Sequence, residues 1–191
     1  SSDLLNKELN SKIFIKAENL QKIGAFKFRG AMNSILKLNN DKKNVLAWSS
    51  GNHAQAIASA CYLTNKNATI VMPEDSPNAK LNGTKSWGAD VVTFDRYSES
   101  REEIGTNLAK EINAEIIPPF DHPDVINGQG TVGYEIINDF KKNNLIPDLV
   151  LCCCGGGGLI AGVSTAIKAE YPNVPIYAVE PEDYNDTYLS L

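Results

Sequence analysis

The sequence predicts an α/β protein with two parallel or mostly parallel open sheets flanked by helices. Short apolar runs alternate with stretches of helical periodicity along the whole chain of 191 residues. Two of the apolar runs lead through a glycine-containing turn directly into a helix. The chain is 42% hydrophobic and 21% charged, as in ordinary globular proteins, so a packed core is expected.

The first elements are assigned from local pattern. Residues 11–18 alternate apolar and polar side chains, which is typical of a strand, and residues 25–38 have helical character. Residues 39–44 are a polar break. A short apolar strand is then expected at 45–48, followed by a helix rich in small residues at 54–63.

The middle of the chain continues the alternation. A strand is expected at 68–72, a helix at 80–87 and a second strand at 90–94. Residues 100–112 carry apolar side chains at intervals of four, which predicts an amphipathic helix. The remaining strands are expected at 115–117, 149–153 and 176–179, and the remaining helices at 129–140 and 159–169.

The four strands between residues 42 and 123 could close a small sheet of their own. The polar break marks the near edge of this unit, and Pro118, Pro119 and Pro123 mark its far edge. We therefore expect a smaller domain at 42–123. Residues 1–41 and 124–191 would together form a larger, incomplete domain.

Charge and hydropathy argue against binding to nucleic acid, insertion in a membrane and secretion. Eighteen Lys and Arg against 23 Asp and Glu give a net charge of −5, so nucleic-acid binding is not expected. No apolar run reaches the ~18 residues that a membrane helix needs. The first ten residues lack a secretory core, so a cytoplasmic location is expected. Cys61 and Cys152–Cys154 lack the spacing of a zinc site and are expected to be small buried thiols.

A strand followed by Gly155–Gly158 and a helix is the strongest local signal. Four glycines let backbone N–H groups approach an anion at a helix start, which favours a phosphate site over a turn without a ligand. Gly156, Gly158 and Ala161, with Glu180 further on, also match a dinucleotide fingerprint. Taken alone, that segment is compatible with a nicotinamide (NAD)-dependent oxidoreductase.

Two further features carry chemical groups. Ser49, Ser50, Gly51, Asn52 and His53 follow a strand and begin a helix, so they either cap it or form a polar cradle for a carboxylate or a cofactor. Lys27 lies between two phenylalanines at a helix start. Both surroundings disfavour the ammonium form and would lower its pKa, unless Lys27 is a surface residue whose stem covers the rings.

These features, in this order, resemble the fold-type II pyridoxal-phosphate (PLP) enzymes, and most closely the serine/threonine dehydratase and serine racemase family. The matching segments extend from residue 13 to about residue 181, and they are IFIKAENLQKIGAFKFRGA, SSGNHAQAIA, INGQGTVGYEI and CGGGGLIAG followed by YAVEP. The resemblance implies the fold of tryptophan synthase β-like enzymes. Family members are longer at both ends, so the chain is expected to be a fragment.

The resemblance also implies site residues. Lys27 would form the Schiff base with PLP, Gly155, Gly156, Gly157 and Gly158 would bind its phosphate, and Asn52 would bond its hydroxyl. The substrate-binding loop would be Ser49, Ser50, Gly51, Asn52 and His53, with Ser50 acting as the second acid/base in racemases. Glu180, Asp186 and the carbonyl of Tyr184 match positions that hold Mg²⁺ or Ca²⁺. From the residues alone, these acids could equally be solvated.

The implied activity is that of a PLP-dependent ammonia-lyase of amino-acid metabolism. It would convert L-threonine or L-serine to a 2-oxo acid and ammonia by β-elimination. The alternatives are a serine racemase that uses Lys27 and Ser50 on opposite faces of PLP, and the nicotinamide-dependent oxidoreductase. A small hydroxy-amino-acid substrate and a homo-oligomer are the expected partners.

Overall fold

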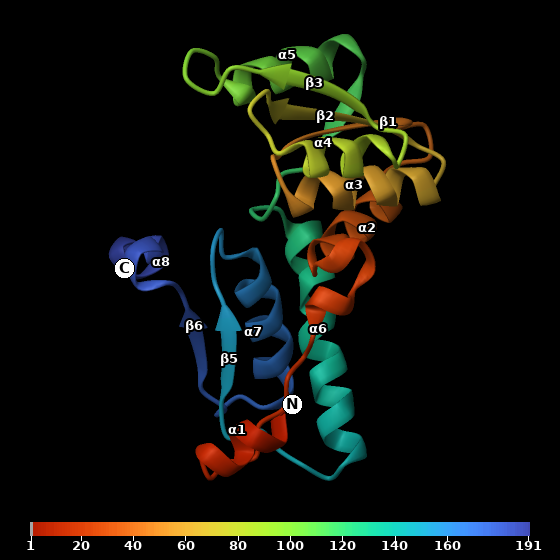
Figure 1. The fold of residues 1–191 in the computed structure, drawn as a ribbon. Helices are drawn as coiled ribbons and strands as arrows, with labels where there is room; N and C mark the ends of the chain where they lie inside the picture. Colours follow the sequence, from red (N-terminus) through yellow and green to blue (C-terminus); the bar gives the residue numbers. More distant parts are fainter. Residues whose placement is uncertain (1) are drawn as a thin grey trace.

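The computed structural model describes residues 2–191 and contains two parallel sheets (Figure 1). The first has the order β3-β2-β1-β4 and the second pairs β5 with β6. The strands are β1 (Asn44–Trp48), β2 (Asn67–Pro73), β3 (Asp90–Phe94), β4 (Ala114–Ile116), β5 (Val150–Cys153) and β6 (Ile176–Val179). The predicted α/β class with parallel sheets flanked by helices is confirmed.

Alternate residues of β1 divide between the two faces of the four-stranded sheet. Val45 and Ala47 pack with α3 (Asn52–Leu63), whereas Leu46 packs with α5 (Arg101–Glu111). Figure 1 shows α3 and α4 (Asn78–Lys85) on one side of this sheet and α5 on the other. Burial on both faces explains why β1 is apolar without alternation.

Helix α6 (Pro123–Lys142) joins the two sheets. It crosses α2 (Lys27–Lys37) at one end and packs along α7 (Gly158–Glu170), which covers the two-stranded sheet (Figure 1). The crossing with α2 is close: a Cβ atom on Gly128 would lie 2.5 Å from the Cα atom of Gly30. Only glycine permits this approach, so α6 fixes the position of α2 relative to the second core.

The strand predicted at residues 11–18 is wrong. Residues 12–17 form no ladder, and the side chains of Phe14 and Ile15 are 53% and 65% exposed. Alternation identifies two faces, but a strand also needs a neighbouring strand, and no described strand lies beside this segment.

The terminal and shorter helices were not predicted. They are α1 (Ser2–Glu8), α8 (Asp186–Ser190) and three 3₁₀ helices at Glu18–Leu20, Lys22–Gly24 and Glu182–Tyr184. Helix α6 also begins six residues before the expected start at residue 129. Pro123 occupies its first turn, and the Nδ1 atom of His122 accepts a hydrogen bond from the N–H of Asp124, which caps the helix.

The division into 42–123 and the flanking segments stays a prediction. Strands β1 to β4 fall inside residues 42–123, but Ala31 and Ile35 of α2 pack into the core of their sheet. Helix α2 therefore contributes apolar side chains to the core on the far side of the expected boundary.

The expectation of buried thiols is wrong for two cysteines, since Cys153 is exposed and Cys154 is only partly buried. Cys61 and Cys152 are buried, and burial raises the pKa values of their thiols to about 12 and about 11. Cys153 is exposed because it follows Cys152 on β5 and points to the face opposite α7, where Leu151 is also exposed. Among residues 2–191, no helix is both long enough and apolar enough to cross a membrane.

Candidate functional site

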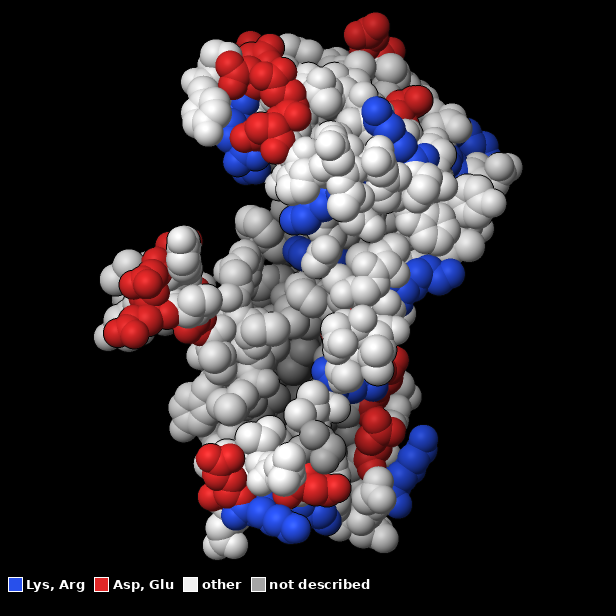
Figure 2. All heavy atoms as spheres, viewed as in Figure 1, with Lys and Arg blue, Asp and Glu red and all other residues white. Residues whose placement is uncertain are grey.

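Four loops at the carboxyl ends of parallel strands form the candidate site. Strands β2, β1 and β4 are neighbours, so the segments 74–77, 49–51 and 117–122 that follow them lie at one edge of the sheet. The fourth loop is Gly155–Gly158, called the tetraglycine loop below, which follows β5. Figure 2 shows the surface hollowed between the parts of the molecule built on the two sheets. Ligands of open α/β folds bind at such edges.

Lys27 is the first residue of α2, and its amine lies among apolar and carbonyl groups. The Nζ atom donates a hydrogen bond of 2.5 Å to the carbonyl oxygen of Pro119. It lies 5.4 Å from the ring centroid of Phe26 and 6.0 Å from that of Phe120. Burial lowers the pKa of Lys27 to about 8. The amine is thus brought towards nucleophilic range at neutral pH, in the direction that the sequence indicated.

His53 is 2% exposed and is the second residue of α3, the helix that follows β1. Its Nε2 atom lies 2.9 Å from the carbonyl oxygen of Ile117, so Nε2 carries the proton and donates it. Burial lowers the pKa of His53 to about 4, and the nearby charge of Lys27 acts in the same direction. His53 is therefore neutral at pH 7, and its Nδ1 atom has no partner among the described residues.

The residues Ser49–His53, called the substrate loop below, do not cap α3 with their side chains. The N-cap residue is Gly51, which has no side chain that could accept a hydrogen bond from the first turn of the helix. Ser49 instead accepts the N–H of Gly51 through its own Oγ atom at 3.2 Å. Ser50 and Asn52 are exposed. Their hydroxyl and amide groups are therefore available to a ligand, which favours the cradle over simple capping.

The tetraglycine loop uses its four residues in two ways. A Cβ atom on Gly156 would lie 2.3 Å from the Phe120 ring, and one on Gly158 would lie 2.9 Å from the Phe120 carbonyl oxygen. By contrast, Cβ atoms on Gly155 and Gly157 would meet nothing within 4 Å. Gly157 also has φ +81°, a left-handed conformation that favours glycine. Packing thus requires two of the glycines, and the other two border open space.

Phe120 connects the lysine with the tetraglycine loop. Its ring lies against Gly156, and its centroid is 6.0 Å from the Lys27 Nζ atom. The segment Ile117–Phe120 also supplies the carbonyl groups that accept from His53 and Lys27. This segment contains Pro118 and Pro119, which the sequence analysis interpreted only as the edge of a domain. Their position directly after a strand at the shared carboxyl edge is the signal that could have identified them.

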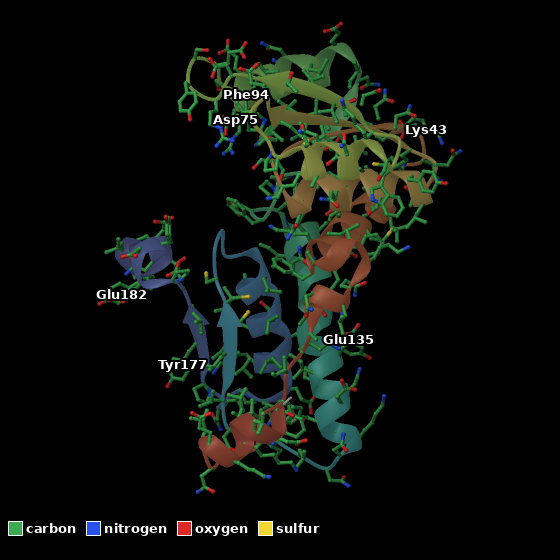
Figure 3. All side chains as sticks on the ribbon, in the orientation of Figure 1. Lys43, Asp75, Phe94, Glu135, Tyr177 and Glu182 are labelled. Carbon is green, nitrogen blue, oxygen red and sulfur yellow. The ribbon has the colours of Figure 1, made fainter. Side chains whose placement is uncertain are left out.

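A second missed residue, Arg29, lies two positions after Lys27. Its side chain is 10% exposed, and all of its N–H groups face acceptors. Its guanidinium donates two hydrogen bonds to Glu18, two to Glu135 and one to Thr131. Figure 3 labels Glu135 on α6. Arg29 lowers the pKa of the Glu135 carboxyl to about 2, and both carboxylates raise the pKa of Arg29. This cluster ties the start of α2 to α6.

The predicted metal ligands lie beyond β6 at the far end of the chain. The two carboxylate oxygens of Glu180 accept hydrogen bonds of 3.0 Å from the N–H groups of Thr187 and Tyr188. Glu180 therefore accepts hydrogen bonds from backbone N–H groups in the first turn of the short helix α8. Among residues 2–191, no group of three or more His, Cys, Asp or Glu side chains is arranged to hold a metal. A site of Glu180, Asp186 and the Tyr184 carbonyl stays a prediction.

Comparisons with known proteins agree on one family. The family model described as "Pyridoxal-phosphate dependent enzyme" matches residues 1–191. The L-threo-3-hydroxyaspartate ammonia-lyase of Saccharomyces cerevisiae is 48% identical over 188 residues, which are 97% of this chain and 56% of that protein. The serine racemase of Schizosaccharomyces pombe is 44% identical, over 97% of this chain and 57% of that protein.

Solved structures show the same relationship. A threonine deaminase from T.th. superposes with a TM-score of 0.87 at 45% identity, and the match covers 94% of this chain and 57% of that one. Maize serine racemase has a TM-score of 0.92 at 37% identity, with 98% and 56% covered. The chain thus spans just over half the length of the relatives it matches.

Proposed function

We propose, because the chain belongs to the pyridoxal-phosphate dependent enzyme family, that it is part of a hydroxy-amino-acid ammonia-lyase. The reaction would convert L-threonine or L-serine to a 2-oxo acid and ammonia by β-elimination. The observation that carries the proposal is the meeting of Lys27 and the tetraglycine loop at Phe120. A reactive amine and an anion-binding turn, 128 positions apart in sequence between Lys27 and Gly155, are brought to the same place.

The residues present fit PLP. Lys27 offers a primary amine whose pKa of about 8 gives it a larger neutral, nucleophilic fraction near neutral pH than an ordinary lysine has. Gly155 and Gly157 leave open space at the start of α7, where backbone N–H groups favour a phosphate. Asn52 is an exposed residue of the substrate loop and could donate a hydrogen bond to the hydroxyl group of the PLP ring. When bound, PLP would supply the electron sink that stabilises negative charge on the substrate Cα atom.

Lys27 would then move the proton. Its free amine would accept the proton from the substrate Cα atom as general base. The Pro119 carbonyl oxygen holds the amine at 2.5 Å and would keep it at a fixed place between steps. Phe26 and Phe120 would exclude water from one side of it. The hydroxyl and N–H groups of the substrate loop would orient the substrate carboxylate.

A racemase is the second candidate, and the exposed hydroxyl group of Ser50 supports it. Ser50 lies on the loop after β1 and Lys27 lies on α2, so the two groups approach the site from different elements. If Ser50 donated a proton to the face opposite Lys27, the product would be the D-amino acid. Relatives of both kinds, ammonia-lyases and serine racemases, match the chain at 44% to 48% identity.

The nicotinamide-dependent oxidoreductase is not retained. The match to the pyridoxal-phosphate family covers the whole chain, and the carboxylate of Glu180 already accepts the N–H groups of two residues of α8. We keep two expectations as proposals: an assembly of identical subunits, and Mg²⁺ or Ca²⁺ at Glu180, Asp186 and the Tyr184 carbonyl. The N–H groups of Thr187 and Tyr188 occupy one acceptor position on each Glu180 oxygen, and a metal would use the remaining ones.

The test of the proposed function is a spectrum of the full-length protein. With PLP added, wild type should show an absorption band at ~410–420 nm and release 2-oxo acid and ammonia from L-serine or L-threonine. Lys27→Ala should lack both the band and the activity. Lys22→Ala, which changes an exposed lysine of the preceding 3₁₀ helix, is the matched control and should keep both. A wild-type protein without the band would contradict the proposal.

A further inference from the structure

Lys80 places an ammonium group beside the substrate loop. It is the third residue of α4, and its Nζ atom lies 3.6 Å from the point where a Cβ atom of Gly51 would be. The loop that precedes α4 follows β2, the strand next to β1 in the sheet. Lys80 therefore reaches the substrate loop from the adjacent carboxyl-end segment.

Helix α4 is held firmly in this place. A Cβ atom on Gly83 would lie 3.2 Å from the side-chain amide of Gln55, so α4 and the first turns of α3 are in close contact. Thr84 is fully buried, and its hydroxyl group donates a hydrogen bond of 2.9 Å to the carbonyl oxygen of Lys80. The backbone from which the Lys80 side chain starts is thus fixed relative to the substrate loop.

The substrate loop by itself offers no positive charge for a carboxylate. Its hydroxyl, amide and N–H groups are neutral, and the helix dipole of α3 adds only a partial charge. His53 is the only titratable side chain of the loop, and it is neutral at pH 7 because burial lowers its pKa to about 4. The His53 ring is buried, and its Nδ1 atom has no hydrogen-bond partner among residues 2–191. A cation from another element would add a charge-assisted hydrogen bond to a carboxylate held here by neutral donors.

The arginines of the described chain are already engaged. Arg29 is enclosed by Glu18 and Glu135, and the arginines at 96 and 101 pair with Asp75 and Glu102. Lys27 is reserved for proton transfer in the proposed function. Lys80 pairs with no carboxylate of residues 2–191. Figure 2 shows basic side chains at the margin of the hollow between the two halves of the molecule.

We propose that Lys80 is a substrate-binding residue whose ammonium group pairs with the α-carboxylate of the amino-acid substrate above Gly51. This inference rests on the proposed function, since it needs an amino acid in the site. It adds a charged partner to a loop of neutral donors. Gly51 contributes by having no side chain between its backbone and the Lys80 amine.

The test compares steady-state kinetics of full-length, PLP-loaded variants with L-serine and L-threo-3-hydroxyaspartate. Lys80→Gln should raise KM about tenfold for both substrates, as expected for a lost charge-assisted hydrogen bond, and should change kcat less than about twofold. Lys80→Arg should restore KM to within about threefold of wild type. Lys85→Gln, at the exposed end of the same helix, is the control and should leave KM unchanged. The absorption band of the bound cofactor should be the same in all four proteins.

Added salt supplies a second readout. It should raise KM of wild type, because it screens the charge pair, and should affect Lys80→Gln less. An active wild type whose KM is unaffected by Lys80→Gln would overturn the assignment of Lys80 alone. A rise in KM restricted to L-threo-3-hydroxyaspartate would also overturn it, since Lys80 would then bind the second carboxylate. A wild type with no band and no turnover would overturn the proposed function, and the role of Lys80 with it.

Discussion

At the scale of single residues, the environment of Lys27 decides what its amine can do. The ordinary pKa of a lysine is 10.5, and burial of this side chain lowers it to about 8. Because burial disfavours the ammonium form, Lys27 is half-protonated near pH 8 and becomes fully protonated only as pH falls well below that value. Burial thus changes its reactivity by removing the ammonium form from water.

Capture of PLP by the metal-free apoprotein should follow this titration. The rate at which the absorption band develops after mixing should rise with pH, reach half of its maximum near pH 8 and level off above that, because the neutral amine is the nucleophile. Stopped-flow absorbance between pH 6 and pH 10.5 measures it. A midpoint near the ordinary value of 10.5 would mean that burial does not act on Lys27 as the structure indicates.

The Ser50 hydroxyl group separates the two candidate activities. Ser50→Ala should reduce D-serine formation by about 10²-fold or more, the usual effect of losing an acid/base group, and should largely spare release of 2-oxo acid. Chiral chromatography and a coupled assay of 2-oxo acid measure the two products from one reaction. An equal loss of both products would exclude a separate proton-donating role for Ser50.

The glycines of the tetraglycine loop should respond unequally to alanine. Gly156→Ala drives a Cβ atom into the Phe120 ring and should lower the free energy of unfolding by about 1–3 kcal/mol, as overpacking does. Gly155→Ala meets no atom within 4 Å, so it should leave stability nearly unchanged. It should nevertheless weaken PLP binding, because the new methyl group borders the space proposed for the phosphate.

Urea unfolding of the apoproteins and titration with PLP measure the two effects separately. Equal destabilisation by both substitutions would show that Phe120 does not distinguish the two glycines. Unchanged PLP affinity in Gly155→Ala would place the phosphate elsewhere.

At the scale of elements, Arg29 joins helix α2 to helix α6 and to the segment around Glu18. Arg29→Met should lower the free energy of unfolding by about 3–5 kcal/mol at pH 7, because it leaves two carboxylates beside an apolar side chain. Lys141→Met removes a pair between exposed side chains, that of Lys141 with Glu170, and should cost less than about 1 kcal/mol. Denaturant unfolding of the three proteins tests this, and a similar small loss in both variants would contradict it.

The pairing of Arg29 with Glu135 also determines how the free energy of unfolding should change at low pH. The folded pKa of Glu135 is lowered to about 2 from 4.5, so its contribution is complete above pH 4.5 and is lost as pH falls towards about 2. Because the Glu135 side chain is 42% exposed, solvent screening reduces the size of the effect. Wild type should lose more stability between pH 5 and pH 3 than Glu135→Gln, and parallel curves would contradict this.

Element prediction succeeded where a segment carries its own signal. Strand β3 at Asp90–Phe94 and strand β6 at Ile176–Val179 have the predicted bounds, because compact apolar runs between turns need no further information. The strand prediction at residues 11–18 was wrong because strand pairing depends on a partner strand, which the local alternation of side chains does not specify. Helix α6 was predicted too short, although Pro123 after His122 is a recognisable start signal.

At the scale of the whole molecule, α6 brings together the carboxyl ends of strands from two sheets (Figure 1). Local motifs identified Lys27, the substrate loop and the tetraglycine loop as chemical candidates, and the resemblance supplied their roles. The residues between them carry no such motif. Phe120 matters because it contacts Gly156, and Lys80 because it lies beside Gly51, and both facts depend on tertiary structure. Sequence patterns locate loops, but packing determines which loops meet.

The most direct test of the account is to identify where PLP becomes attached. Full-length protein would be incubated with PLP, reduced with borohydride and digested, and the modified peptide would be located by mass spectrometry. The account predicts one modified lysine, Lys27, and competition of free phosphate with the labelling. Labelling of another lysine, or labelling of Lys27 that is insensitive to phosphate, would contradict the claim that Lys27 and the tetraglycine loop hold the same molecule.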